Sequence, residues 1–255
     1  MKLVIKSEGP GRGWWGPPKG THTAANAPGG KDVEEPGYGY GRKKRGVKRK
    51  KPPEKAKPKP EPKSEKPRYG SGEHPLTATQ EGEERIRITE AIIATATSGE
   101  TGALYTPDGT QLFSKANPYG SFIEFTDDEI AAIKKSAAQG PVIFTHSHPS
   151  GHSFSPEDMV CATSWNVAEM RAVGRMPLTT ETFLYRMSRP KGGWGSFGKF
   201  NAVYDEAEKR VTNKMWGKIN TGKITPALAG YWHHHEIWLD VSRQMGWDYS
   251  REQVD

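Results

Sequence analysis

Residues 142–158 read VIFTHSHPSGHSFSPED, and this stretch joins a buried strand to a capped helix. The β-branched and aromatic run from Val142 to Thr145 predicts the strand. Ser155 followed by Pro156 predicts the first turn of the helix, because serine caps helices and proline suits the first helical position. Three of the chain's eight histidines lie between the two elements. We therefore expect this strand–loop–helix unit to carry a functional site.

Other segments predict a mixed α/β fold with one sheet and helices packed on it. Residues 101–116 predict two strands joined by a Pro-Asp-Gly turn. Residues 85–97 fit either a strand or a short helix, and Thr126 caps a helix that ends at Gly140. The remaining predicted elements are a strand at 121–126, a helix at 156–170, strands at 171–175 and 181–188, and helices at 200–217 and 225–246.

Composition divides the chain into a tail and a foldable part. Only 33% of the residues are hydrophobic, and the chain holds 29 glycines and 20 prolines. Residues 1–80 lack a periodic apolar pattern and cannot bury enough apolar area to offset the entropy of ordering, so we expect a disordered tail there. The rest is long enough for one core. We divide it into a central domain, 83–190, and a helical extension packed on it, 191–255.

The basic character of the chain belongs to the tail. Residues 42–68 contain 14 Lys and Arg but 3 Asp and Glu, a local charge of +11, whereas the whole chain carries +7. Such a run is either a solvated linker or a non-specific contact for nucleic acid, and both interpretations stay open. Any attraction to polyanions is expected from the tail.

Other features narrow the class of protein. The single cysteine, Cys161, excludes an internal disulfide framework and a Cys-rich zinc site. We expect Cys161 in the core, because it lies one turn after Asp158 on an apolar helix face. No run of about 18 apolar residues is present, so we expect no membrane contact, and residues 1–25 lack the apolar region of a signal peptide.

The histidine spacing predicts a metal site. His146 and His148 are two residues apart at the end of a strand, so their side chains point the same way. Asp158 lies in the first turn of the next helix, which the loop can bring back beside them. Two imidazoles and one carboxylate, with a fourth position open to water, are typical of catalytic zinc. We therefore predict one Zn²⁺ held by these three residues, although a His-x-His pair alone is weak evidence.

The stretch HSHPSGHSFSPED resembles the signature of the JAMM (MPN, Mov34 or JAB) metallopeptidases. The resemblance covers roughly residues 85–190 and implies a central mixed sheet flanked by helices, similar to the cytidine-deaminase fold. It places the zinc ligands at His146, His148 and Asp158. Ser155 falls on the serine that supports the oxyanion. One departure is that six residues separate His148 from Ser155, where the commoner pattern has seven.

The family also uses a glutamate on an early strand as general base. JAMM domains place this glutamate eight residues before an aspartate at a turn, and Glu100 and Asp108 have that separation. Glu90 is the alternative, further back in the chain. The resemblance thus implies that Glu100 and Ser155 are catalytic.

A narrower resemblance points to JAMM-like domains of bacteriophage head-associated proteins and of proteins proposed to be phage toxins. In those domains the histidine loop is followed by an Arg-x-Val strand and then by Tyr-x-Met-x-Arg-Pro. The residues in those places are Arg171, Val173, Tyr185, Met187, Arg189 and Pro190. This resemblance implies a location in the host cytoplasm or on the virion.

Together these resemblances imply a zinc metallopeptidase or isopeptidase that acts on a protein or peptide. Two alternatives stay open. One is a non-catalytic JAMM-fold assembly module of a phage particle, with a tail that contacts nucleic acid. The other is a RadC-like protein of DNA metabolism.

Further predictions concern two single residues and one group of three histidines. Ser147, between the two histidines, should point away from the metal and have a structural role. His152 is expected to be exposed in its loop, with a role near the substrate or behind the ligands as the alternative. The triplet His233–His235 cannot bind one ion, because successive helical residues point about 100° apart, so its neighbours are expected to serve packing.

Overall fold

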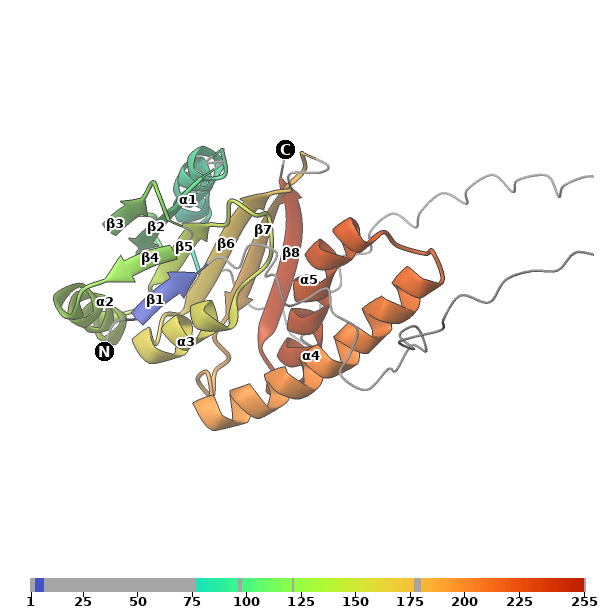
Figure 1. The fold of residues 1–255 in the computed structure, drawn as a ribbon. Coiled ribbons are helices and arrows are strands. Elements are labelled where there is room, and N and C mark those ends of the chain that lie inside the picture. Colours follow the sequence, from blue (N-terminus) through green and yellow to red (C-terminus); the bar gives the residue numbers. More distant parts are fainter. Residues whose placement is uncertain (1–2, 7–76, 96–97, 121, 177–179, 255) are drawn as a thin grey trace, which may run out of the picture. The chain divides into compact units, whose positions relative to one another are not determined.

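The computed structural model describes residues 3–6, 77–95, 98–120, 122–176 and 180–254 (Figure 1). The basic run 42–68 and most of the predicted 1–80 tail therefore lie outside the described residues. At the two ends of that segment, residues 3–6 form a strand and Gln80 begins a helix, capped by the Thr79 side chain.

The described residues form five helices and eight strands. The helices are α1 (Gln80–Ile93), α2 (Asp127–Gln139), α3 (Pro156–Trp165), α4 (Phe197–Asn220) and α5 (Pro226–Met245). The strands are β1 (Leu3–Lys6), β2 (Glu100–Tyr105), β3 (Gln111–Asn117), β4 (Phe122–Phe125), β5 (Ile143–Ser147), β6 (Glu169–Arg175), β7 (Thr182–Ser188) and β8 (Asp248–Val254).

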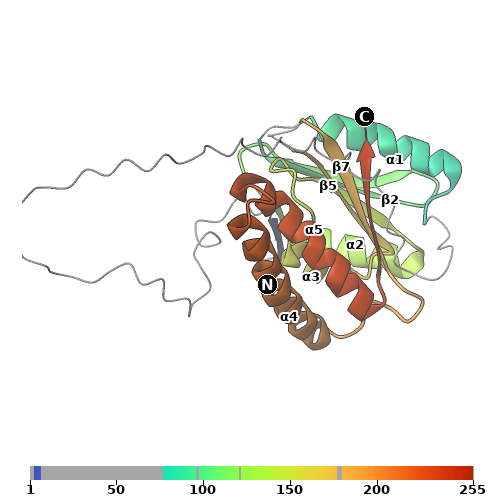
Figure 2. The same cartoon turned by 90° about the vertical axis from the view of Figure 1, so that its right-hand side faces the viewer.

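Six of the strands form one mixed sheet in the order β3-β2-β5-β6-β7-β8. Strands β5 and β6 are parallel and are connected through α3, while the other neighbouring pairs are antiparallel. Strands β1 and β4 form a separate antiparallel pair. This arrangement confirms the predicted mixed α/β fold with helices packed on a central sheet (Figure 2).

The structure decides between the two interpretations left open for residues 85–97, since residues 85–93 belong to helix α1. Two other local predictions are confirmed. The turn at 107–109 joins β2 to β3, and Gly109 has a φ of 80°, a value that glycine adopts without strain. Helix α2 starts with a capping box in which Thr126 and Glu129 bond each other's backbone N–H groups.

Two predictions about the second half are wrong. Helix α3 ends at Trp165 and not at Met170, because Asn166 adopts a left-handed conformation and ends the helix. Glu169 and Met170 instead pair with β5 and β7. The 191–255 extension is also not purely helical, since β8 pairs with β7 along its whole length and completes the sheet.

Alternation along the strands gives the sheet two different faces. Thr145 and Arg171, which are partners in the β5–β6 register, have side chains that bond Glu90 of helix α1. The next pair, His146 and Ala172, points to the opposite face. We call the first the α1 face and the second the histidine face. Helix α1 lies on one side of the sheet and α5 on the other (Figure 2).

Aromatic rings fix α3 on the histidine face. The Trp165 ring, at the end of α3, meets Phe125 at 4.9 Å and Phe144 at 5.4 Å between centroids, both edge-on. All three side chains are buried, and such pairs add to the stabilisation that their burial provides. The helix that carries Asp158 is thereby anchored to strand β5, which carries His146. None of the described helices has the length and apolar character needed to cross a lipid bilayer.

A network of ion pairs joins helix α1 to the α1 face of the sheet. Glu83 of α1 accepts hydrogen bonds from Arg87 (2.9 Å), Arg171 (2.7 Å) and Arg186. Burial opposes ionisation of Glu83, but the charges of Arg171 and Arg186 and these hydrogen bonds lower its pKa from 4.5 to about 2. The carboxylate form of Glu83 is thus favoured by folding.

We predict that Glu83→Gln destabilises the protein by about 3 kcal/mol at pH 7, the energy equivalent of this pKa shift. Because the folded pKa is depressed, the stabilisation is complete above pH 4.5 and is lost as the pH falls toward 2. Denaturant unfolding of both proteins across this range measures the gap. As a control, Glu81→Gln removes an exposed pair with Arg85 and should change stability by less than about 1 kcal/mol. A gap that did not change with pH would contradict this explanation.

Candidate metal centre

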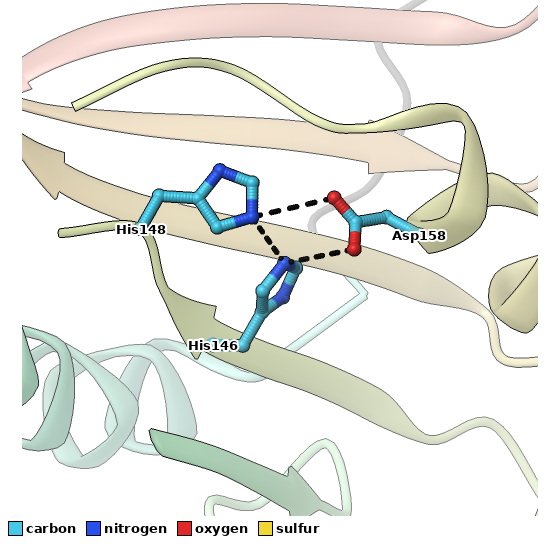
Figure 3. A group of neighbouring side chains, drawn as sticks. All are labelled: His146, His148 and Asp158. Carbon is cyan, nitrogen blue, oxygen red and sulfur yellow. Dashed lines mark hydrogen bonds and ion pairs between the residues drawn. The ribbon is translucent and has the colours of Figure 1, made fainter. Parts of the chain in front are cut away.

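The two histidines converge at the carboxyl end of β5. Every residue of this strand is buried, and His148 follows directly after it. As the alternation of a strand requires, both rings lie on the histidine face, with their Nε2 atoms 2.9 Å apart (Figure 3). A left-handed Gly151, with φ of 73°, turns the chain there so tightly that a Cβ atom would meet the Arg175 carbonyl oxygen at 2.8 Å.

The start of helix α3 brings Asp158 to the same point. Ser155 is the N-cap, and its Oγ accepts a hydrogen bond from the Asp158 N–H at 3.2 Å. In return, the Ser155 N–H donates to Asp158 Oδ2 at 2.7 Å. This capping box fixes the direction of the carboxylate, whose oxygens lie 3.3 Å from Nε2 of His146 and of His148 (Figure 3).

These three residues fit a metal ion. Ligand atoms at zinc bond lengths from a tetrahedral ion lie about 3.3–3.4 Å from one another. The separations here are 2.9 Å between the imidazole nitrogens and 3.3 Å from each nitrogen to the carboxylate. Asp158 Oδ1 is buried and accepts no hydrogen bond within the part of the chain described. Among those residues, this is the one cluster of three His, Cys, Asp or Glu side chains that can hold a metal ion.

Because the cluster is buried, the ionisation of each of its three side chains depends on the charges of the other two. Burial disfavours the ionised form of Asp158, but its interactions with the two facing imidazoles hold its pKa well below its usual range. Burial lowers the pKa of His146. Burial would also lower the pKa of His148, but the hydrogen bond and charge of Asp158 outweigh it and raise that pKa to about 9. The buried carboxylate therefore requires positive charge beside it, which a proton on an imidazole or a bound metal cation can supply.

A backbone carbonyl orients the second histidine. His148 Nδ1 lies 3.0 Å from the carbonyl oxygen of His152. Because a carbonyl only accepts, Nδ1 carries the hydrogen, and the lone pair of a neutral ring is then on Nε2, facing the other ligands. The expectation that His152 is exposed is wrong, since its ring is buried against Tyr231 and His234. A backbone acceptor has no residue-type signal, so the sequence could not identify this role.

The two candidate bases, Glu100 and Glu90, lie on opposite faces of the sheet. Glu100 begins β2, is fully buried, and precedes Gly102, the partner of His146, by two residues, so it belongs to the histidine face. Its charge contributes to raising the pKa of His148. Glu90 lies on the α1 face, where its carboxylate bonds Thr145 and Arg171. Of the two glutamates, Glu100 alone lies on the histidine face.

Neighbouring residues have structural roles. Ser147 Oγ accepts a hydrogen bond at 3.0 Å from the Thr101 N–H, in agreement with the structural role predicted for Ser147. Cys161 is buried as expected, and burial raises the pKa of its thiol well above the usual value. The side chain of Ser155 is buried beside Asp158.

The histidine triplet of α5 does not converge on a common point. His233 Nε2 lies 2.9 Å from the Thr212 hydroxyl on α4. The ring of His234 stacks on His152 with centroids 5.3 Å apart. His235 Nδ1 lies 2.9 Å from the Tyr249 hydroxyl on β8. As predicted from the helical spacing, the three rings point to three different surroundings.

Comparison with family models, curated proteins and solved structures gave no match. The interpretation of the site therefore rests on its own geometry. That geometry gives a buried metal-binding arrangement of two histidines and one aspartate, with a buried glutamate on the same face of the sheet.

We predict that the purified protein binds one Zn²⁺ and that the double variant His146→Ala/His148→Ala binds none, because two of three ligands are lost. Elemental analysis after dialysis measures the stoichiometry. His233→Ala is the matched control, since it removes a buried imidazole that bonds Thr212 on α4. Equal zinc content in the double variant and the wild type would show that the ion binds elsewhere.

Proposed function

We propose that the protein is a zinc-dependent hydrolase of the JAMM type that cleaves an amide or isopeptide bond in a protein or peptide. The observation that carries this proposal is the three-ligand cluster of His146, His148 and Asp158, with Glu100 on the same face. A set of three protein ligands leaves a position for water or substrate, which is typical of catalytic zinc. The sequence resemblance to JAMM metallopeptidases supports the same reaction, and the narrower resemblance to JAMM-like domains of phage proteins supports a phage origin.

A zinc ion held by the cluster would lower the pKa of a water molecule to about 7 and polarise a substrate carbonyl. Glu100 would be the general base for this water and would return the proton to the leaving amine. Its placement supports this role, because it is buried on the histidine face and acts electrostatically on His148. A proton held by Glu100 stays out of bulk water until the amine leaves.

Ser155 would stabilise negative charge that develops on the substrate. Its Oγ already accepts the Asp158 N–H, and its own hydrogen can donate to the oxygen of a substrate carbonyl as that oxygen becomes charged. All five residues of the site are buried. Exclusion of water strengthens each of these electrostatic interactions, because the local dielectric is low.

We predict that Glu100→Gln keeps its zinc but loses hydrolysis by at least a hundredfold, because the amide cannot take up a proton. The assay is cleavage of a quenched-fluorescence peptide library that includes lysine isopeptide bonds, beside elemental analysis. Glu90→Gln is the control. It changes a buried carboxylate on the α1 face and should retain the wild-type activity and zinc content. Activity that survived Glu100→Gln but not Glu90→Gln would reverse the assignment of the base.

A second candidate function concerns the basic run 42–68, which carries a local charge of +11. We infer non-specific DNA binding by this run, either beside hydrolysis or as part of an assembly module or a RadC-like role in DNA metabolism. Such binding depends on phosphate contacts that release counterions.

We predict that random-sequence duplex DNA binds the full chain, that affinity falls at least tenfold between 50 and 200 mM salt, and that deletion of 42–68 abolishes binding. Fluorescence anisotropy measures all three results. Binding that persisted after the deletion would place the DNA site on another part of the chain.

A further inference from the structure

The loop between the metal ligands is held along its length by the second half of the chain. We call residues 149–154 the histidine loop. Four consecutive residues of it contact different partners. The Gly151 carbonyl accepts from Tyr185, the His152 ring meets Tyr231 and His234, Ser153 bonds Tyr249, and the Phe154 carbonyl accepts from Trp238. Except for Tyr185 of β7, these partners lie in α5 and β8, far along the sequence from the ligands.

Trp238 hydrogen-bonds the same peptide group that hydrogen-bonds the Asp158 carboxylate. Its indole N–H donates to the Phe154 carbonyl oxygen at 2.6 Å. The N–H of that same peptide unit belongs to Ser155 and donates to Asp158 Oδ2 at 2.7 Å. One planar unit is thus fixed by Trp238 on one side and orients the carboxylate ligand on the other.

Tyr249 has a similar role beside His148, because it hydrogen-bonds the residue next to the carbonyl group that bonds the His148 ring. Its hydroxyl lies 2.8 Å from Ser153 Oγ and 2.9 Å from His235 Nδ1, and its side chain is buried. Ser153 is joined by its peptide bond to the His152 carbonyl, which bonds His148 Nδ1. The hydroxyl of Tyr249 therefore fixes the residue next to the carbonyl that directs the ring of His148.

We propose that Trp238 and Tyr249 are positioning residues of the metal centre, and that the α5–β8 segment is an integral part of it. This inference rests on the proposed metal site but not on the hydrolytic reaction. Partners behind metal ligands set ligand orientation, and their loss costs about 10- to 100-fold in metal affinity. A purely structural role in the core would lower stability and leave metal affinity unchanged.

Two buried residues elsewhere provide matched controls. The Trp194 indole N–H donates to the Val167 carbonyl at 2.9 Å, away from the loop. The Tyr105 hydroxyl bonds Thr89 and Gln111 on the α1 face. Trp194→Phe and Tyr105→Phe thus remove the same chemical groups as Trp238→Phe and Tyr249→Phe, without touching the histidine loop.

The test compares these four variants in the full chain. Chelator competition gives the zinc affinity, the visible spectrum of bound Co²⁺ gives the ligand geometry, and thermal unfolding gives Tm. We expect Trp238→Phe and Tyr249→Phe to bind zinc at least tenfold more weakly and to alter the Co²⁺ spectrum. Their controls should lose similar Tm but keep the wild-type affinity and spectrum.

Ser153→Ala removes the Tyr249 contact from the loop side and should reproduce the effect of Tyr249→Phe, even where the latter folds poorly. Variants that bound zinc as tightly as their controls would overturn the inference, and so would controls that weakened binding equally. A wild type that bound zinc but cleaved nothing would contradict the hydrolase proposal alone. A wild type that bound no metal would overturn both.

Discussion

The burial of the Asp158 charge is the constraint on which the site depends. This carboxylate has no exposed surface, and an isolated charge at such a depth is very costly. The fold meets the cost with the Ser155 N–H and with two imidazoles that face the carboxylate. The buried arrangement therefore needs positive charge beside the carboxylate, which either a proton or a metal cation can supply.

Strands β5 and β6 have residues with different roles on the two faces of the sheet. On the α1 face, β5 and β6 present Thr145, which hydrogen-bonds Glu90 of helix α1, and Arg171, which forms ion pairs with Glu83 and Glu90 of that helix. One residue further along β5, His146 points to the histidine face. The rigid α1 face thus supports the strand whose end carries the ligands. Charge on one face contributes to stability, and charge on the other is available for binding.

The features that could be predicted from the sequence are those that depend on residues close together in the chain. His146, His148 and Asp158 lie within 13 residues, and strand alternation with a serine cap determines how they meet. Those rules need no information from distant residues. The order of most strands and helices followed from equally local patterns, whereas the mixed sheet was implied by the resemblance to JAMM domains.

The missed features depend on distant contacts. Strand β8 has a weak apolar pattern, with Tyr249 as its one fully buried residue, and is a strand because β7 pairs with it. Helix α1 could not be told from a strand, because its charged residues point toward arginines of the sheet. The burial of His152 depends on α5, which lies about 80 residues later in the chain.

The most direct measurement of the central claim is anomalous diffraction at the zinc absorption edge from crystals grown with zinc. The account predicts one strong peak about 2 Å from Nε2 of His146, from Nε2 of His148 and from an Asp158 oxygen. A peak at another cluster, or no peak between these three side chains, would contradict it.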